Sequence, residues 1–295
     1  MLTTQREKQA ALLLAVTMLC FAANHVIGRG VHGELPPLGL SFWRWFMGAV
    51  ILFPFVAPGL GEAVPRYRQH WRLFAMLGLL MIGSTSLVLV GLNFTTATNT
   101  SLINATQPTI TALLCWIFLQ DRLSSIQWCG IVIAFAGVVQ MILRGDWQGF
   151  DSLSFDRGDL IVLLAMFGFA GYAINIRKIP GDFTALQSLF AVIIFGTVAL
   201  LPFYITETLL YKPMSFSWQT ALVVVALSLL VSVAGMLMWT RGNQLIGPNR
   251  AAIYMNLLPL FGAILAVIFL QETIAAYHWI GGVLIAGGMW LVLRI

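Results

Sequence analysis

The stretch IFLQDRLSSIQWCG at residues 117–130 returns in altered form as IFLQETIAAYHWIG at residues 268–281. At this offset of 151 (268 minus 117), residues 108–137 align with residues 259–288 without a gap, and eleven of the thirty positions are identical. Unrelated apolar helices coincide at only a few positions. We therefore interpret the match as an internal duplication, and a duplication of this length sets the architecture of the whole chain.

The composition predicts a membrane protein. Of the 295 residues, 59% are apolar and 9% are charged, whereas a soluble domain carries roughly 25% charged residues. The apolar residues form blocks of about 20, enough for a helix to cross a hydrocarbon layer of roughly 30 Å, and lipid leaves no alternative to helix for the backbone. The ten predicted spans are residues 10–28, 38–58, 73–92, 98–119, 125–143, 158–176, 184–206, 218–240, 248–270 and 274–293.

The predicted fold class is therefore an all-α integral membrane protein with ten transmembrane helices in one domain, residues 1–295. Five spans fall in a first repeat, residues 9–143, and five in a second, residues 157–294. Because five is odd, the second copy enters the bilayer from the opposite side. Inverted repeats of this kind are typical of secondary transporters, which bind their substrate near the midplane.

The charge distribution predicts the orientation. With the N-terminus in the cytoplasm, eleven Lys and Arg residues fall on the cytoplasmic side and four on the other, which is the positive-inside pattern. Both termini are then cytoplasmic, and topology explains the net charge of +5 without nucleic acid. Three cysteines, all inside predicted spans, favour neither disulfides nor a metal cluster.

Two longer stretches carry a family resemblance: TNTSLINATQPTITALLCWIFLQDRLSSIQWCGIVIAFAGVV (98–139) and PNRAAIYMNLLPLFGAILAVIFLQETIAAYHWIGGVLIAGGM (248–289). Each combines a small or polar helix start, a mid-helix proline, an acidic residue at the helix end, and then tryptophan and spaced glycines. The chain resembles the ten-helix EamA-type branch of the drug/metabolite transporter superfamily. The resemblance implies export or exchange of small metabolites, often amino acids.

A polar stripe marks the fourth predicted span. Thr100, Asn104, Gln107 and Thr111 lie on one helical face, where amides must face the protein interior or water. We interpret the stripe as the wall of a substrate cavity, with contact between helices as the alternative. The second half offers Tyr254 and Asn256 at the corresponding level, and Ser232 and Trp239 on a stripe with Ser228 and Gly235 are further candidates.

Pro108 and Pro259 occupy equivalent positions in the fourth and ninth spans. A proline inside a helix frees the carbonyl four residues earlier, which predicts free carbonyls at Asn104 and Met255. The two prolines are candidate hinges, or they only bend their helices.

Polar residues at opposite ends of the equivalent first and sixth helices are candidate gates. Asn24 and His25 lie near one end, and Tyr172 and Asn175 near the other. Capping or packing roles are the alternative.

Arg44, in FWRWF, is the one charge well inside a predicted span. An intramembrane charge is a functional candidate, here for binding a substrate carboxylate, although its long side chain could instead extend to lipid headgroups or pair structurally. Gly130 with Gly137, and Gly281 with Gly288, are predicted close-packing faces.

The chemistry that the sequence lacks narrows the function. No Asp or Glu lies deep in a predicted span, which favours a facilitator or exchanger over proton-driven transport. Together with what the resemblance implies, we expect a secondary transporter that moves a small polar or amphiphilic metabolite, such as an amino acid or related compound, outward across a bacterial inner membrane by alternating access. A channel or a proton-coupled drug exporter is the alternative. We expect no enzymatic activity, cofactor or metal. The expected partners are a small-molecule substrate and the lipid bilayer, without nucleic acid, and the expected state is a monomer or homodimer.

Overall fold

The computed structural model describes residues 5–30, 35–95, 100, 103–143, 145–146, 156–215, 217–270 and 276–293, and all elements in these ranges are helical. The side chains of residues 24–30, 263, 266, 267, 269 and 270 lie outside this description. The first half contains α1 (Gln5–Gly30), α2 (Pro37–Val56), η1 (Ala57–Gly59), α3 (Leu60–Gln69), α4 (Trp71–Gly78), η2 (Leu79–Gly83), α5 (Ser84–Gly91), α7 (Gln107–Leu119) and α8 (Ser125–Ile142). The second contains α9 (Arg157–Asn175), η4 (Ile176–Lys178), α10 (Ala185–Leu210), α11 (Trp218–Leu227), η5 (Ser228–Gly235), α12 (Met236–Ile246), α13 (Pro248–Ala252), η6 (Ile253–Asn256), α14 (Leu257–Leu270) and α15 (Ala276–Leu293).

The helices make a multi-pass membrane protein. Within the described residues, seven helical segments are long and apolar enough to cross a bilayer. Large apolar side chains such as Phe55, Val132 and Val283 remain exposed on the outer faces of the helices, as expected where lipid rather than water is the solvent. The second segment is longer than predicted: instead of ending near residue 58, it continues through η1 and α3 to Gln69.

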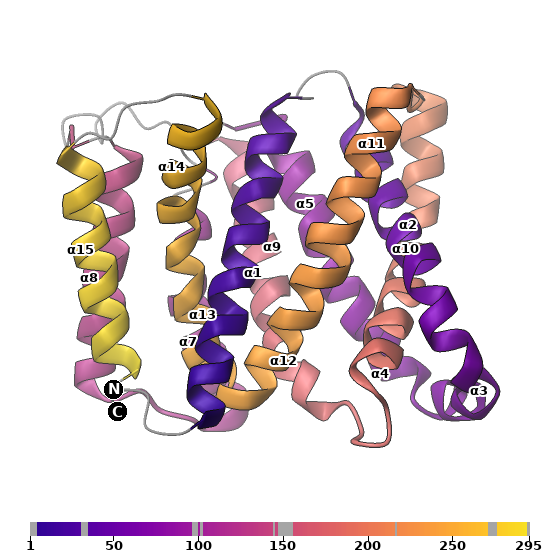
Figure 1. Ribbon diagram of the computed structural model, residues 1–295, viewed down its shortest axis with the longest axis horizontal. Coiled ribbons are helices and arrows are strands. Elements are labelled where there is room, and N and C mark those ends of the chain that lie inside the picture. Colours follow the sequence, from indigo (N-terminus) through magenta and orange to yellow (C-terminus); the bar gives the residue numbers. More distant parts are fainter. Residues whose placement is uncertain are drawn as a thin grey trace.

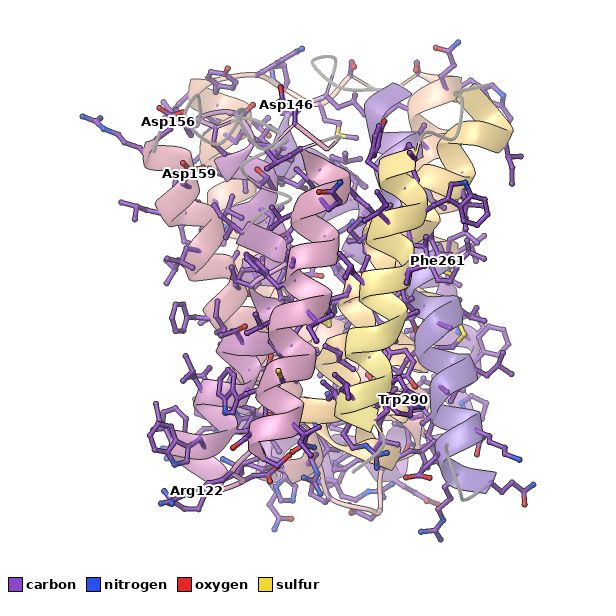
Figure 2. The ribbon with its side chains drawn as sticks, turned by 90° about the vertical axis from the view of Figure 1, so that its left-hand side faces the viewer. Arg122, Asp146, Asp156, Asp159, Phe261 and Trp290 are labelled. Carbon is purple, nitrogen blue, oxygen red and sulfur yellow. The ribbon has the colours of Figure 1, made fainter. Side chains whose placement is uncertain are left out.

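The helices run side by side between two faces of the molecule. α1 begins and α15 ends on one face, the lower one in Figure 1, which we call the termini face. Arg122 lies on the termini face, whereas Asp146, Asp156 and Asp159 lie on the opposite face (Figure 2). α1 therefore starts at the termini face, while its predicted counterpart α9 starts at the opposite one.

The main helix contacts join one half to the other. α8 packs along α15, and α2 along α10. α1 packs on α12 and α14, and in the corresponding arrangement α9 packs on α5 and α7. Each of these pairs takes one helix from each half, so the halves interlock around a shared core instead of forming two separate bodies.

Glycines allow the closest of these approaches, as predicted. A Cβ on Gly130 would lie 2.7 Å from the Gly288 carbonyl oxygen, and one on Gly137 would lie 2.7 Å from the Gly281 carbonyl oxygen. The repeat offset of 151 relates Gly130 to Gly281 and Gly137 to Gly288. The two contacts are therefore equivalent to each other, as expected for a two-fold axis between α8 and α15. The predicted close-packing role of these four glycines is confirmed.

Two helices contain a π-helical segment at equivalent places. η2 lies between α4 and α5, and η5 lies between α11 and α12. Shifted by 151, residues 79–83 become residues 230–234, which fall inside η5. π-helical turns are rare and are found mostly at functional sites. The third and eighth spans are therefore not uniform α-helices.

Candidate substrate site

The fourth and ninth segments are broken near their middles. α7 begins at Gln107 after a turn at residues 105–106, and Pro108 is in its first turn. In the second half, the five-residue α13 passes into the 3-10 turn η6 before α14, whose first turn contains Pro259. A proline is tolerated in the first turn of a helix, where its missing N–H has no intrahelical acceptor.

The expectation of continuous helices kinked at the prolines is therefore wrong in detail: each break precedes its proline. The Met255 carbonyl, expected to be free, accepts from the Leu257 amide. In the first half, the turn before α7 is closed by the Thr106 amide, which donates to the Ile103 carbonyl at 3.0 Å. Discontinuous helices at equivalent places are the elements from which transporters build midplane sites. The hinge role of Pro108 and Pro259 stays a prediction.

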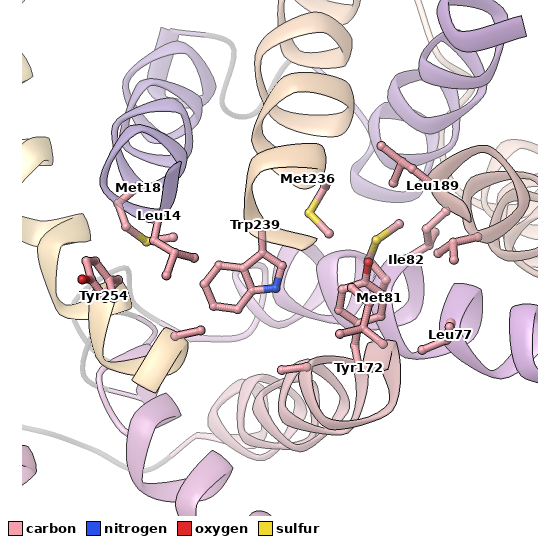
Figure 3. Close-up of a cluster of buried hydrophobic side chains, with 14 of the residues drawn as sticks. Leu14, Met18, Leu77, Met81, Ile82, Tyr172, Leu189, Met236, Trp239 and Tyr254 are labelled. Carbon is pink, nitrogen blue, oxygen red and sulfur yellow. The ribbon is translucent and has the colours of Figure 1, made fainter. Parts of the chain in front are cut away.

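Aromatic and methionine side chains from both halves meet beside these breaks. Figure 3 shows Leu14 and Met18 of α1 between Tyr254 of η6 and Trp239 of α12, with Tyr172 of α9 on the far side of the indole. The hydroxyl oxygens of Tyr172 and Thr240 are 3.3 Å apart. Figure 3 places Met81 and Met236 in the same cluster. Methionine adapts its shape readily, which makes this cluster a candidate lining for a substrate site.

The polar stripe of the fourth segment is buried, and part of it faces α9. Thr100, Gln107 and Thr111 are buried, and Asn104 is half-buried. The Gln107 amide lies 3.4 Å from the Thr111 hydroxyl. In its hydrogen-bonding orientation the amide also donates to the Met166 carbonyl at 3.3 Å and accepts from the Ala170 amide at 3.2 Å. The Gln107 amide therefore joins α7 to α9, as the alternative of contact between helices expects, while binding of substrate by this stripe stays a prediction.

Other buried polar groups have no protein partner within the described part of the chain. They include Thr100 Oγ1, Ser232 Oγ, Asn256 Oδ1 and both amide atoms of Asn243. An unsatisfied buried donor or acceptor costs about 1–3 kcal/mol, so a ligand that supplied hydrogen bonds here would be favoured. Asn243 was missed from the sequence, although it continues the stripe of Ser232 and Trp239 by four residues on α12.

Arg44 is buried in α2, only 5% exposed, with its guanidinium carbon 5.0 Å from the centre of the Trp45 ring. The Ser228 hydroxyl donates to the Arg44 carbonyl at 2.8 Å, and Ser232 lies one turn along η5, against Gly48. This burial does not fit a side chain that extends along the lipid-facing surface. Arg44 and Ser232 thus both lie where α2 of the first half packs on η5 of the second half. Binding of a carboxylate by Arg44 stays a prediction.

The candidate gates are only partly visible. The side chains of Asn24 and His25 lie outside the described residues. Asn175 donates to the Gly171 carbonyl at 2.8 Å, a local bond at the end of α9 that fits the capping alternative. Tyr172 belongs to the central cluster. Among the described residues, no group of three or more His, Cys, Asp or Glu could hold a metal.

Paired breaks in equivalent helices around a buried centre are typical of membrane transporters, and comparison with known proteins gives the family. The chain matches the EamA-like transporter family over residues 8–143 and again over residues 156–294. The protein is a member of that family.

Relatives cover nearly the whole chain. It is 28% identical to the "Uncharacterized transporter YyaM" of Bacillus subtilis over 87% of this chain and 84% of the relative. It is 28% identical to an "Uncharacterized transporter" of Archaeoglobus fulgidus over 95% and 96%. It is 25% identical to the "Probable amino-acid metabolite efflux pump" of Escherichia coli over 97% and 94%. A crystal structure 18% identical in sequence covers 96% of both chains with a TM-score of 0.77, a likeness of fold.

Proposed function

We propose that the protein is a secondary transporter that moves a small polar or amphiphilic metabolite, such as an amino acid or a related compound, by alternating access. The observation that carries the proposal is the pairing of equivalent breaks: α7 with α13 and η6, and η2 with η5. Elements that interrupt equivalent helices in both halves give the protein two matched places at which it can bend.

The proposed architecture has ten membrane-spanning segments in two inverted repeats, residues 9–143 and 157–294. The opposite directions of α1 and α9, the glycine pairs of α8 and α15, and the cross-half contacts support it. In this arrangement the first segment is α1, the fourth contains α7, and the ninth runs from α13 through η6 to α14. We place the protein in a bacterial inner membrane with both termini in the cytoplasm, because the basic residues concentrate on the termini face.

The proposed binding region combines the central cluster with unsatisfied polar groups of η6, η5 and the segment before α7. Trp239, Tyr254 and the methionines would hold an apolar part of the substrate, and Asn256, Ser232 and Thr100 would bind its polar groups. The relative in Escherichia coli, the "Probable amino-acid metabolite efflux pump", supports this class of substrate and outward transport. The family and its relatives are transporters, a class distinct from enzymes.

A passive or exchange mechanism is the simplest one for these residues. The carboxylates described within helices lie near helix ends, as Glu7, Asp159 and Glu207 do. Proton-driven carriers use acidic groups inside the membrane. A channel or a proton-coupled drug exporter is the competing function.

Counterflow in proteoliposomes tests the proposal. Vesicles loaded with one unlabelled amino acid at a time are diluted into labelled substrate. The carrier predicts saturable uptake that requires the internal substrate and is unchanged when the proton gradient is collapsed. Non-saturating flux would indicate a channel, and flux lost with the gradient would indicate proton coupling.

A further inference from the structure

Two cavities follow each other along one face of α8. Gln127, Ile131 and Phe135 are spaced by four residues, which places them on one side of the helix about 6 Å apart along its axis. Gln127 lines a polar cavity at the termini face, whereas Ile131 and Phe135 line an apolar cavity further into the membrane. The order is therefore polar at the membrane surface and apolar toward its middle.

The polar cavity has a volume of about 300 Å³. It lies between the α7–α8 connection, η4 and the end of α12. Its lining consists of Asp121, Arg122, Leu123, Gln127, Arg177, Gln244, Leu245, Ile246, Gly247, Pro248, Asn249 and Arg250. Its lining thus includes three guanidinium groups, from three different elements, and one carboxylate.

Two of these charged groups are already engaged. Asn249 Nδ2 donates to Asp121 Oδ2 at 2.8 Å, and Arg250 Nη1 pairs with Glu7 Oε1 at 2.9 Å. Within the described part of the chain, neither Arg122 nor Arg177 forms an ion pair. The Arg122 guanidinium carbon lies 6.0 Å from the centre of the Trp116 ring. Both arginines are exposed and their two positive charges exceed the single charge of Asp121, so they can bind an anion, and guanidinium matches phosphate geometry well.

The apolar cavity has a volume of about 260 Å³. It is lined by Thr106, Thr109, Trp128, Ile131, Val132 and Phe135. It lies between the start of α7 and α8. This space stays open because α8 packs along α15 through its glycines and makes few contacts with the other helices. Figure 2 shows this end of the molecule from outside, with Arg122 at the termini face.

We propose that the two cavities together bind one anionic phospholipid, with its phosphate at Arg122 and Arg177 and an acyl chain between α7 and α8. A phospholipid in the bilayer has the same order of polarity along the membrane normal. Basic pockets between helices at the membrane surface are suited to anionic headgroups. The apolar cavity selects a lipid over a free phosphate or another small anion, and the site is independent of the proposed transport function.

The test uses the full-length protein in detergent and native mass spectrometry. Phosphatidylglycerol and phosphatidylcholine are titrated against the wild type, R122Q/R177Q and the control R68Q/R72Q, whose exposed arginines lie near the same face outside the cavity. An arginine near an anionic lipid surface contributes about 1 kcal/mol. R122Q/R177Q should therefore bind phosphatidylglycerol roughly 25-fold more weakly, and the control should match the wild type. Equal binding by all three proteins would overturn the proposal.

The acyl chain has its own test. Val132 is 61% exposed toward lipid, so V132W should fold while its indole occupies the apolar cavity, and we expect weaker phosphatidylglycerol binding with both arginines intact. Glycerol phosphate, the soluble headgroup, should not displace the lipid at equal concentration. Unchanged lipid binding by V132W, or displacement by glycerol phosphate, would mean that the site takes a free anion and would overturn the proposal.

Discussion

The packing of α8 on α15 predicts a large effect from one added methyl group. In Gly137→Ala the new Cβ would lie 2.7 Å from the Gly281 carbonyl oxygen and 2.9 Å from the Ile285 amide nitrogen. Both are backbone atoms, so the helices must separate. Overpacking of this kind costs typically about 1–3 kcal/mol, of which the better helix propensity of alanine offsets up to roughly 1 kcal/mol.

Thermal unfolding of the purified protein measures this cost. A loss of about 1–2 kcal/mol should lower Tm by roughly 2–6 °C in a chain of this size. Gly287→Ala is the matched control, because a Cβ there would meet nothing within 4 Å although the residue is on the partner helix α15. The control should keep or slightly raise Tm. If Gly137→Ala were as stable as Gly287→Ala, the close approach of the two helices would be refuted.

The remaining predictions concern the centre and the termini face. Asn256→Ala should lower counterflow about tenfold, the equivalent of one lost hydrogen bond of about 1.4 kcal/mol, with unchanged folded yield; undiminished flux would remove Asn256 from the site. Gln107→Ala should instead lower Tm, because its amide bridges to the backbone of α9, and an unshifted Tm would contradict that contact. Arg250→Gln should destabilise the protein by about 1–3 kcal/mol, since the Glu7 carboxylate and the Leu293 carbonyl lose a charged donor. If the double variant Glu7→Gln/Arg250→Gln were even less stable than Arg250→Gln alone, that would argue against the ion pair of Arg250 with Glu7. Treatment with a chelator should leave flux unchanged, and a loss restored by a divalent metal would reveal a metal requirement.

The features predicted best from the sequence were those that occur in both copies of the duplication. The offset of 151 identified Gly130, Gly137, Gly281 and Gly288, and the structure pairs them across α8 and α15. Such contacts are predictable because a small residue that recurs on one face of an apolar helix has few uses other than close packing.

The sequence predicted less well where the helices depart from α geometry. Hydropathy does not distinguish a π or 3-10 turn from an α turn, so η2, η5 and η6 could not be expected. Proline position alone also placed the breaks too late, since Pro108 and Pro259 begin helices.

Side-chain direction was the other limit. The spacing of Gln107 and Thr111 correctly placed both residues on the buried face of α7. Only the structure shows that the Gln107 side chain reaches the backbone of α9. Asn243 extends a stripe that was already recognised, and following it for one more turn would have identified this residue. Arg44 lies in a span as predicted, but whether an intramembrane arginine extends to the surface or is buried depends on neighbours far away in the sequence.

The inverted relation of the two halves is tested most directly by the sidedness of two equivalent residues. Ser125 and Ala276 differ by the repeat offset, begin α8 and α15, and are both exposed. Each is replaced by cysteine in a variant without Cys20, Cys115 and Cys129, and intact cells are treated with a thiol reagent that does not cross the inner membrane. Inverted halves predict that the reagent labels position 276 and leaves position 125 unlabelled until the cells are opened. Labelling of both positions from the same side would contradict the inverted repeat and, with it, the proposed mechanism of transport.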